Sequence, residues 1–189
     1  MKPKIFILVG VIIAAGTLSG CLMVEVFEYR ITISADGHHA TSESIYRNIE
    51  GSDKKEQFDI DFDEMIESWK GPEYVAERAK EGVVVTERTL KLEKGKLVGI
   101  QRSTFSDTSQ GFKNLFSTDS LRLGFKNKDV KQIVRTNGTV HKTKDSTYIV
   151  WPKTIKDYRL TMKAKMEGDH ASFVQKFQHY LKKESAKKP

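Results

Sequence analysis

Cysteine is almost absent from this chain: the single one among 189 residues is Cys21. The residues that follow it offer no thiol for a disulfide, for nucleophilic catalysis or for a cysteine metal site. Four patterns are missing as well, namely G-x-S-x-G, HExxH, the P-loop and G-x-G-x-x-G. Sequence support for a serine hydrolase, a zinc protease or a nucleotide-using enzyme is therefore lacking. We expect a protein that is not an enzyme and that holds no cofactor and no metal.

The chain begins with its one long uncharged apolar run. Lys2 and Lys4 supply two cations, residues 5–15 are mostly branched aliphatics, and residues 16–20 shift to small side chains around one leucine. This order is typical of a secretory signal peptide. The alternative is a retained membrane-spanning helix, which needs about 20 predominantly apolar residues. The apolar centre is too short for that, so we predict a signal peptide over residues 1–20.

Leu18-Ser19-Gly20-Cys21 resembles the lipobox of bacterial lipoproteins, and the resemblance covers only the first 21 residues. It implies cleavage between Gly20 and Cys21, a diacylglyceryl group on the Cys21 thiol, and often an acyl chain on the new amine. Two or three chains suffice for stable anchoring, because each buried methylene contributes about 0.8 kcal/mol. The implied location is the bacterial cell envelope. Leu22, where Asp would favour the inner membrane, points to the periplasmic face of the outer membrane.

The length after the signal peptide fits one domain with its own core. Residues 21–189 number 169 and carry 30 basic against 25 acidic side chains. Such a mild basic excess is compatible with a polyanionic neighbour and also with plain solubility. We predict a lipidated N-terminus and short tether over residues 21–26, a single domain over 27–182 and a basic tail over 183–189.

Alternating apolar and polar side chains, with turn residues between them, predict strands that pair as antiparallel hairpins. Asp36-Gly37 and residues 93–96 mark the first two turns, and Asn137-Gly138 marks a third. The predicted strands are residues 27–33, 39–49, 83–92, 97–105, 121–125, 130–136, 139–143, 146–151 and 158–166. Residues 106–120 are predicted to be a loop with a short helical turn.

Helical spacing of apolar residues appears in three places. Phe62, Met65, Ile66 and Trp69 share one face, after Asp59 or Asp61 as a cap. Residues 72–80 form a second helix ended by Gly82. A last helix, capped by Asp169, places Phe173, Phe177, Tyr180 and Leu181 on one face. The predicted fold class is α+β, a mainly antiparallel sheet built from hairpins and packed by two or three helices including a C-terminal helix.

Neither the acidic nor the histidine side chains follow a metal-site pattern. Asp59, Asp61, Asp63 and Glu64 alternate as calcium ligands can, but the EF-hand glycine is missing and a helix N-terminus accommodates carboxylates anyway. Adjacent His38 and His39 point to opposite sides of a strand. The other three, at positions 141, 170 and 179, are scattered.

Basic residues near the C-terminus form the candidate contact surface. Arg159, Lys163 and Lys165 share one side of a predicted strand, and Lys182 and Lys183 continue the charge after the last helix. Beside an anionic bilayer, each such side chain contributes about 1 kcal/mol. The alternative is a solvated strand face and a soluble tail. An envelope location excludes nucleic acid as a partner.

The sequence thus predicts a membrane-anchored envelope lipoprotein that acts as a non-enzymatic binding or interaction module. Its partners, besides the membrane, would be anionic lipid headgroups, a cell-wall polymer or another envelope protein. The alternative is a carrier of a lipid or other hydrophobic ligand. A carrier requires an apolar cavity of roughly 300 Å³ or more, lined by residues such as Phe105, Trp151 and Phe177.

Overall fold

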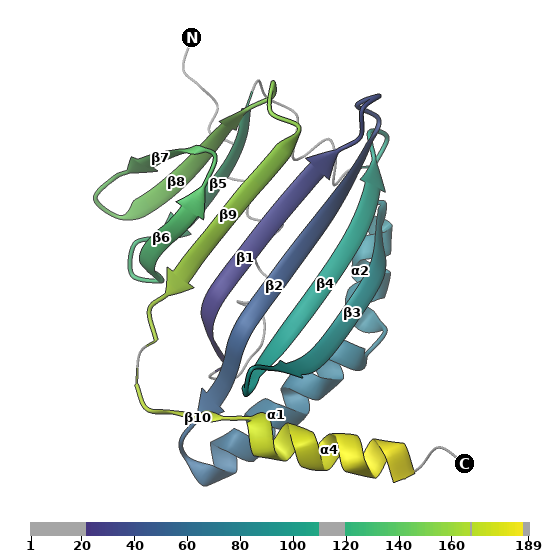
Figure 1. The fold of residues 1–189 in the computed structure, drawn as a ribbon, viewed down its shortest axis with the longest axis vertical. Helices are drawn as coiled ribbons and strands as arrows, with labels where there is room; N and C mark the ends of the chain where they lie inside the picture. Colours follow the sequence, from purple (N-terminus) through teal and green to yellow (C-terminus); the bar gives the residue numbers. More distant parts are fainter. Residues whose placement is uncertain (1–21, 110–119, 167, 187–189) are drawn as a thin grey trace.

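The computed structural model describes residues 22–109, 120–166 and 168–186, which form two antiparallel sheets and three helices. The large sheet has the strand order β3-β4-β2-β1-β9-β6, with β10 paired to β2 (Figure 1). Its strands are β1 (Met23–Ile33), β2 (His39–Ser52), β3 (Val83–Glu93), β4 (Lys96–Ser106), β6 (Val130–Thr136), β9 (Asp157–Ala164) and β10 (His170–Ser172). The expected α+β class with a mainly antiparallel sheet is confirmed.

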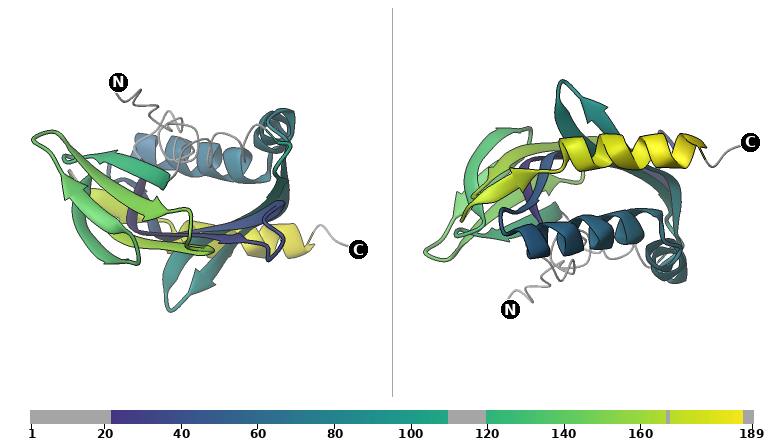
Figure 2. Two further views of the ribbon diagram at one scale, coloured as in Figure 1. Left: turned by 90° about the horizontal axis from the view of Figure 1, so that it is seen from above. Right: turned by 90° about the horizontal axis from the view of Figure 1, so that it is seen from below.

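A small sheet and three helices complete the molecule. The small sheet consists of β5 (Ser120–Lys126), β8 (Ser146–Pro152) and β7 (Thr139–Lys142), in the order β5-β8-β7. Helices α1 (Lys55–Lys70) and α2 (Glu73–Lys80) lie behind the large sheet, and α4 (Val174–Ala186) crosses its lower end (Figures 1 and 2). We call the sheet face away from α1 and α2 the open face.

The core lies between the large sheet, α1 and the small sheet. Along β1, the side chains of Phe27, Tyr29, Ile31 and Ile33 are buried and alternate with more exposed ones, as the period of a strand requires. Trp151 of the small sheet meets Tyr158 of β9 edge to face, with ring centroids 6.1 Å apart. One continuous apolar cluster therefore joins both sheets.

Two of the predicted turns are confirmed. β1 pairs with β2 around Asp36-Gly37, where Gly37 has a φ of +80°. β3 pairs with β4 around Lys94 and Gly95, whose φ angles of 50° and 74° match a two-residue hairpin turn.

The third predicted hairpin, at Asn137-Gly138, is wrong. β6 pairs with β9 in the large sheet, whereas β7 pairs with β8 in the small one. Asn137 instead joins the sheets, because its Oδ1 accepts hydrogen bonds from Trp151 Nε1 and from the Arg159 backbone N–H, both at 2.9 Å. A Cβ on Gly138 would lie 2.6 Å from Trp151 Nε1, so glycine is required for this close approach.

Several predicted boundaries also differ. β2 continues to Ser52 and α1 begins at Lys55, so neither Asp59 nor Asp61 caps that helix. Residues 170–172 form β10, and α4 begins four residues later than a cap at Asp169 would require. The first strand starts at Met23 rather than at residue 27, and α4 extends to Ala186. Most of the predicted loop over residues 106–120 lies outside the described residues.

Candidate functional site

The start of β1 and the start of α4 both lie at the lower end of the large sheet. Met23 and Ser172 both pair with Glu50 of β2, one from each side. α4 begins at Val174, directly after β10. Cys21 precedes Met23 by two residues, which span at most about 7 Å of extended chain. The first residue of β1, Met23, therefore lies at the end of the sheet that carries α4 (Figure 1).

α4 has one buried face and one basic face. Phe177 is buried, and Tyr180 packs on it and on Phe62 of α1, with ring centroids 6.0 and 6.3 Å away. Leu181 has 42% of its surface exposed, and the adjacent Lys182 and Lys183 are exposed too. This combination of an exposed apolar side chain with cations is typical of a helix that contacts a lipid headgroup region.

The other predicted basic residues lie on or near β9. Arg159 is on the open face, opposite Arg30 of β1. Lys163 is half-buried and pairs with Val26, nearer the lower end. β9 ends at Ala164, so Lys165 follows the strand instead of belonging to it. The structure does not bring β9 and the basic end of α4 into one patch, since they lie at opposite sides of the sheet (Figure 1).

Arginines and carboxylates alternate across the open face. Arg30 Nε lies 2.7 Å from Asp157 Oδ1, and Arg102 Nε lies 2.7 Å from Glu43 Oε2. Further ion pairs join Arg159 to Asp157, Arg102 to Glu87, and Arg47 to Glu28 and Glu93. The hydrogen bond from Arg30, followed by that from Arg159, lowers the pKa of Asp157 against the opposing effect of burial. These cations are already neutralised, so the open face has little charge left for a polyanion.

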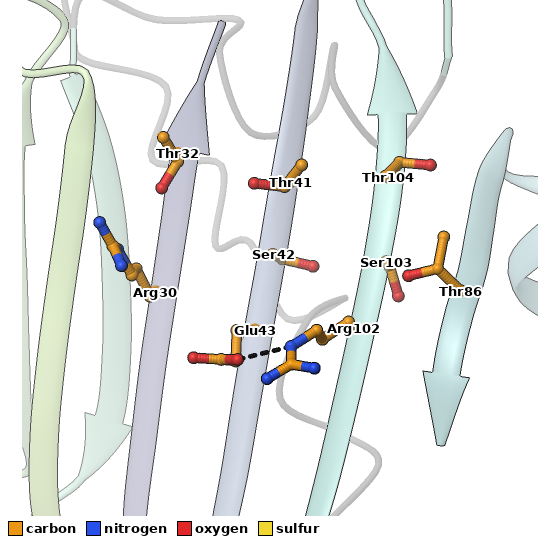
Figure 3. Close-up of a pocket in the computed structure, with 9 residues that line it drawn as sticks. All are labelled: Arg30, Thr32, Thr41, Ser42, Glu43, Thr86, Arg102, Ser103 and Thr104. Carbon is orange, nitrogen blue, oxygen red and sulfur yellow. Dashed lines mark hydrogen bonds and ion pairs between the residues drawn. The ribbon is translucent and has the colours of Figure 1, made fainter. Parts of the chain in front are cut away.

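A hollow of about 200 Å³ lies on this face, lined mainly by hydroxyl and charged side chains (Figure 3). The lining residues are Arg30, Thr32, Thr41, Ser42, Glu43, Thr86, Arg102, Ser103 and Thr104. The volume is below the roughly 300–1,000 Å³ of pockets that enclose small molecules. The hollow suits contact with one polar side chain of a partner rather than enclosure of a ligand.

The acidic run has a structural role in this fold. Asp61 is fully buried and accepts hydrogen bonds from the Ser52 backbone N–H at 2.9 Å and from Gln57 Nε2 at 2.7 Å. It thereby ties β2 to α1. Asp59 is exposed and pairs with Lys176 of α4 at 2.6 Å. Within residues 22–109, 120–166 and 168–186, no three His, Cys, Asp or Glu side chains are grouped so that they could hold a metal ion.

The three side chains named for a carrier cavity belong to the core. Phe105, Trp151 and Phe177 are at most 6% exposed and are members of the same apolar cluster. None of them lines the hollow of Figure 3.

Sequence reasoning missed a group beneath α2 that we call the aromatic–arginine cluster: Tyr29, Tyr46, Trp69, Tyr74, Arg78 and Arg88. The Arg88 guanidinium lies over the Tyr74 ring at 4.3 Å and over the Trp69 ring at 5.1 Å. Trp69 meets Tyr46 edge to face at 5.6 Å. The alternation of side chains along β3 could have revealed that Arg88 faces the core side, because Arg88 lies on the same side of the strand as Leu90 and Leu92.

The predicted cleavage and lipidation residues, Gly20 and Cys21, lie outside the described residues. Among the helices of the described ranges, none is long and apolar enough to cross a membrane. The chain matches no protein-family model, no curated protein sequence and no solved structure.

Proposed function

We propose that this protein is a lipid-anchored bacterial envelope protein whose domain is a non-enzymatic interaction module, held with its α4 end against the membrane. The observation that carries the proposal is the common position of Met23 and Ser172 on either side of Glu50. A diacylglyceryl group on Cys21 would leave at most about 7 Å of chain before the sheet begins. The domain would therefore rest on the headgroups, with α4 beside them.

Distance from the anchor decides which basic residues can contact lipid. Lys182 and Lys183 lie on α4 at the anchored end, and Lys163 is three strand positions above Met23, about 10 Å away. Arg159 is opposite Arg30, seven positions or about 23 Å above Met23. Beyond a Debye length of about 8 Å, surface charges are largely screened, and Arg159 is paired with Asp157 in any case. We therefore propose Lys182 and Lys183 as the headgroup contacts and leave Arg159 out.

In this orientation the strands run away from the membrane, and the open face points sideways, so that a second envelope protein can contact it. Its self-paired charges and its small polar hollow favour a partner surface of mixed polarity over a polyanionic cell-wall polymer. Leu22 favours the outer membrane, with the domain on the periplasmic side.

The anchor is tested by replacing Cys21 with alanine in the producing bacterium. We expect the native protein in the membrane fraction, with the mass of the acyl groups on a Cys21 peptide, and the Cys21→Ala variant outside the detergent phase. Thr17→Ala, which leaves the four lipobox residues intact, is the control and should fractionate like the native protein. Equal detergent partitioning of the Cys21→Ala variant, with no acyl mass on the native peptide, would refute the proposal.

A further inference from the structure

Side chains from six elements, α2 among them, meet beneath that helix. Trp69 lies in the last turn of α1, Tyr74 and Arg78 come from α2, and strands β1, β2, β3 and β4 contribute Tyr29, Tyr46, Arg88 and Gln101. Gly99 makes room for the indole, since a Cβ there would lie 2.5 Å from Trp69 Cη2. Most of these side chains are aromatic, which suits contact with an apolar or aromatic body.

Four hydrogen-bond donors in this cluster have no acceptor among the residues that the structure describes. They are Tyr29 Oη, Trp69 Nε1, Arg78 Nε and Arg88 Nε, all of them buried, and Tyr29 is only 6% exposed. Arginine and tryptophan side chains can only donate. Buried polar groups are normally paired, so several orphaned donors in one place indicate a missing acceptor.

One of these donors belongs to a cation without a carboxylate partner. Arg88 makes no salt bridge within the described part of the chain, and its Nη1 donates to the Ser68 carbonyl at 2.9 Å. Burial lowers the pKa of Arg88, whereas the nearby Tyr74 and Tyr46 act in the opposite direction. A partly buried guanidinium is stabilised by an anion, which it can bind through two N–H groups.

α2 can separate from the sheet at low cost. None of its eight residues is buried, and Gly71 and Gly82 flank it, the latter with a φ of +72°. Gln101 Nε2 donates to the Tyr74 hydroxyl at 2.7 Å and tethers the helix to β4. Segments with little buried surface separate from a fold more easily than its core does.

We propose that the aromatic–arginine cluster binds a ligand whose carboxylate or phosphate group is received by Arg88 and the neighbouring orphaned donors, and whose apolar or aromatic body lies among the tyrosines and Trp69. α2 covers the bound ligand. This site does not depend on the lipid anchor or on the membrane-facing end.

Calorimetric titration of the full-length protein tests the site, in neutral phosphatidylcholine nanodiscs with empty nanodiscs as the blank, or in buffer if the chain proves soluble. The probes are 2-naphthoate, 2-naphthyl phosphate and the neutral 2-naphthamide, which distinguish a carboxylate from a phosphate and an anion from an uncharged acceptor. We expect one of the anions to bind at least about tenfold more tightly than the amide, as the charge-assisted hydrogen bonds require.

Two variants and one control locate the binding. Arg88→Gln should weaken anion binding at least about tenfold, and Tyr29→Phe about three- to tenfold. Arg135→Gln, at an exposed position of β6, should bind like the native protein. Tyr29→Phe should not lower the melting temperature, because it removes an unpaired buried hydroxyl. Equal affinity for all three probes, native affinity in Arg88→Gln, or no saturable binding would overturn the proposal and leave water as the occupant.

Discussion

Asp157 illustrates how single residues hold the open face together. Its carboxylate accepts hydrogen bonds from Arg30 of β1 at 2.7 Å and from Arg159 of its own strand at 2.7 Å. Arg30 contributes most to lowering the pKa of Asp157. The same carboxylate thus links β1 to β9, and it is charged whenever the pH is above its lowered pKa.

Replacing Asp157 with asparagine should lower the free energy of unfolding by about 1 kcal/mol at pH 7, a modest amount because water screens the half-exposed Arg30. A carboxyl group with a lowered folded-state pKa stabilises the fold above its ordinary value near about 4, and that contribution disappears as the pH falls through the folded-state pKa. Urea unfolding at pH 7 and pH 3 should show the difference between native and variant protein shrinking at the lower pH.

Asp145→Asn is the matched control for this measurement, since the Asp145 side chain is exposed and has no salt bridge in the described structure. It should change stability by less than about 0.5 kcal/mol at either pH. A native-to-Asp157→Asn difference that stays constant from pH 7 to pH 3 would contradict the ion-pair account.

Among the elements, α4 has two distinct roles: it packs against the core and it presents an exposed basic surface. Its inward face holds Phe177 in the core, and Lys176 pairs with Asp59 of α1. Leu181, one turn after Phe177 on the same side of the helix, is nevertheless 42% exposed, and the exposed Lys182 and Lys183 follow it. The helix therefore both closes the lower end of the core and presents the surface proposed to meet the membrane.

Phe177→Ala and Leu181→Ala separate these two roles on one helix. Phe177 is 1% exposed, so its truncation should cost about 3–5 kcal/mol of unfolding free energy. Leu181 is 42% exposed, and its truncation should cost less than about 1 kcal/mol. Denaturant unfolding of both variants checks this, and equal losses would show that α4 does not pack as described.

On the scale of the whole molecule, helix α4 and the β1–β2 turn at Asp36-Gly37 lie at opposite ends of the sheet (Figure 1). β1 runs from Met23 to Ile33, ten strand steps or about 33 Å. A domain that rests on its α4 end must therefore keep this turn far from the bilayer.

Single cysteines carrying an NBD label test this orientation in vesicles that contain lipids with a nitroxide quencher. Once Cys21 carries the proposed diacylglyceryl group, the chain offers no competing thiol. We expect strong quenching of the label at Ser185→Cys on α4 and little at Ala35→Cys, an exposed position in the far turn. Equal quenching at both positions would mean that the domain lies flat or tumbles on its anchor.

The sequence by itself determined the features that depend on local order. Alternation over residues 27–33 makes β1 a half-buried strand, the residue types in two turns fix the first two hairpins, and helical spacing places Phe177 inward. The lipobox is likewise a local pattern, and its consequence for anchoring stays a prediction. Each of these follows from neighbours along the chain, which side-chain periodicity and turn preference express directly.

Only the tertiary structure decided which distant segments meet. A strand and turn pattern cannot show that β6 and β7 join different sheets, because Asn137 finds its partners in Trp151 and Arg159. Tertiary contacts also decided three other features: the start of α1, the burial of Asp61, and the contact of Arg88 with Tyr74 and Trp69. These features depend on hydrogen bonds and packing between residues that are far apart in the sequence. Such residues come into contact only when the strands pair and the sheets form.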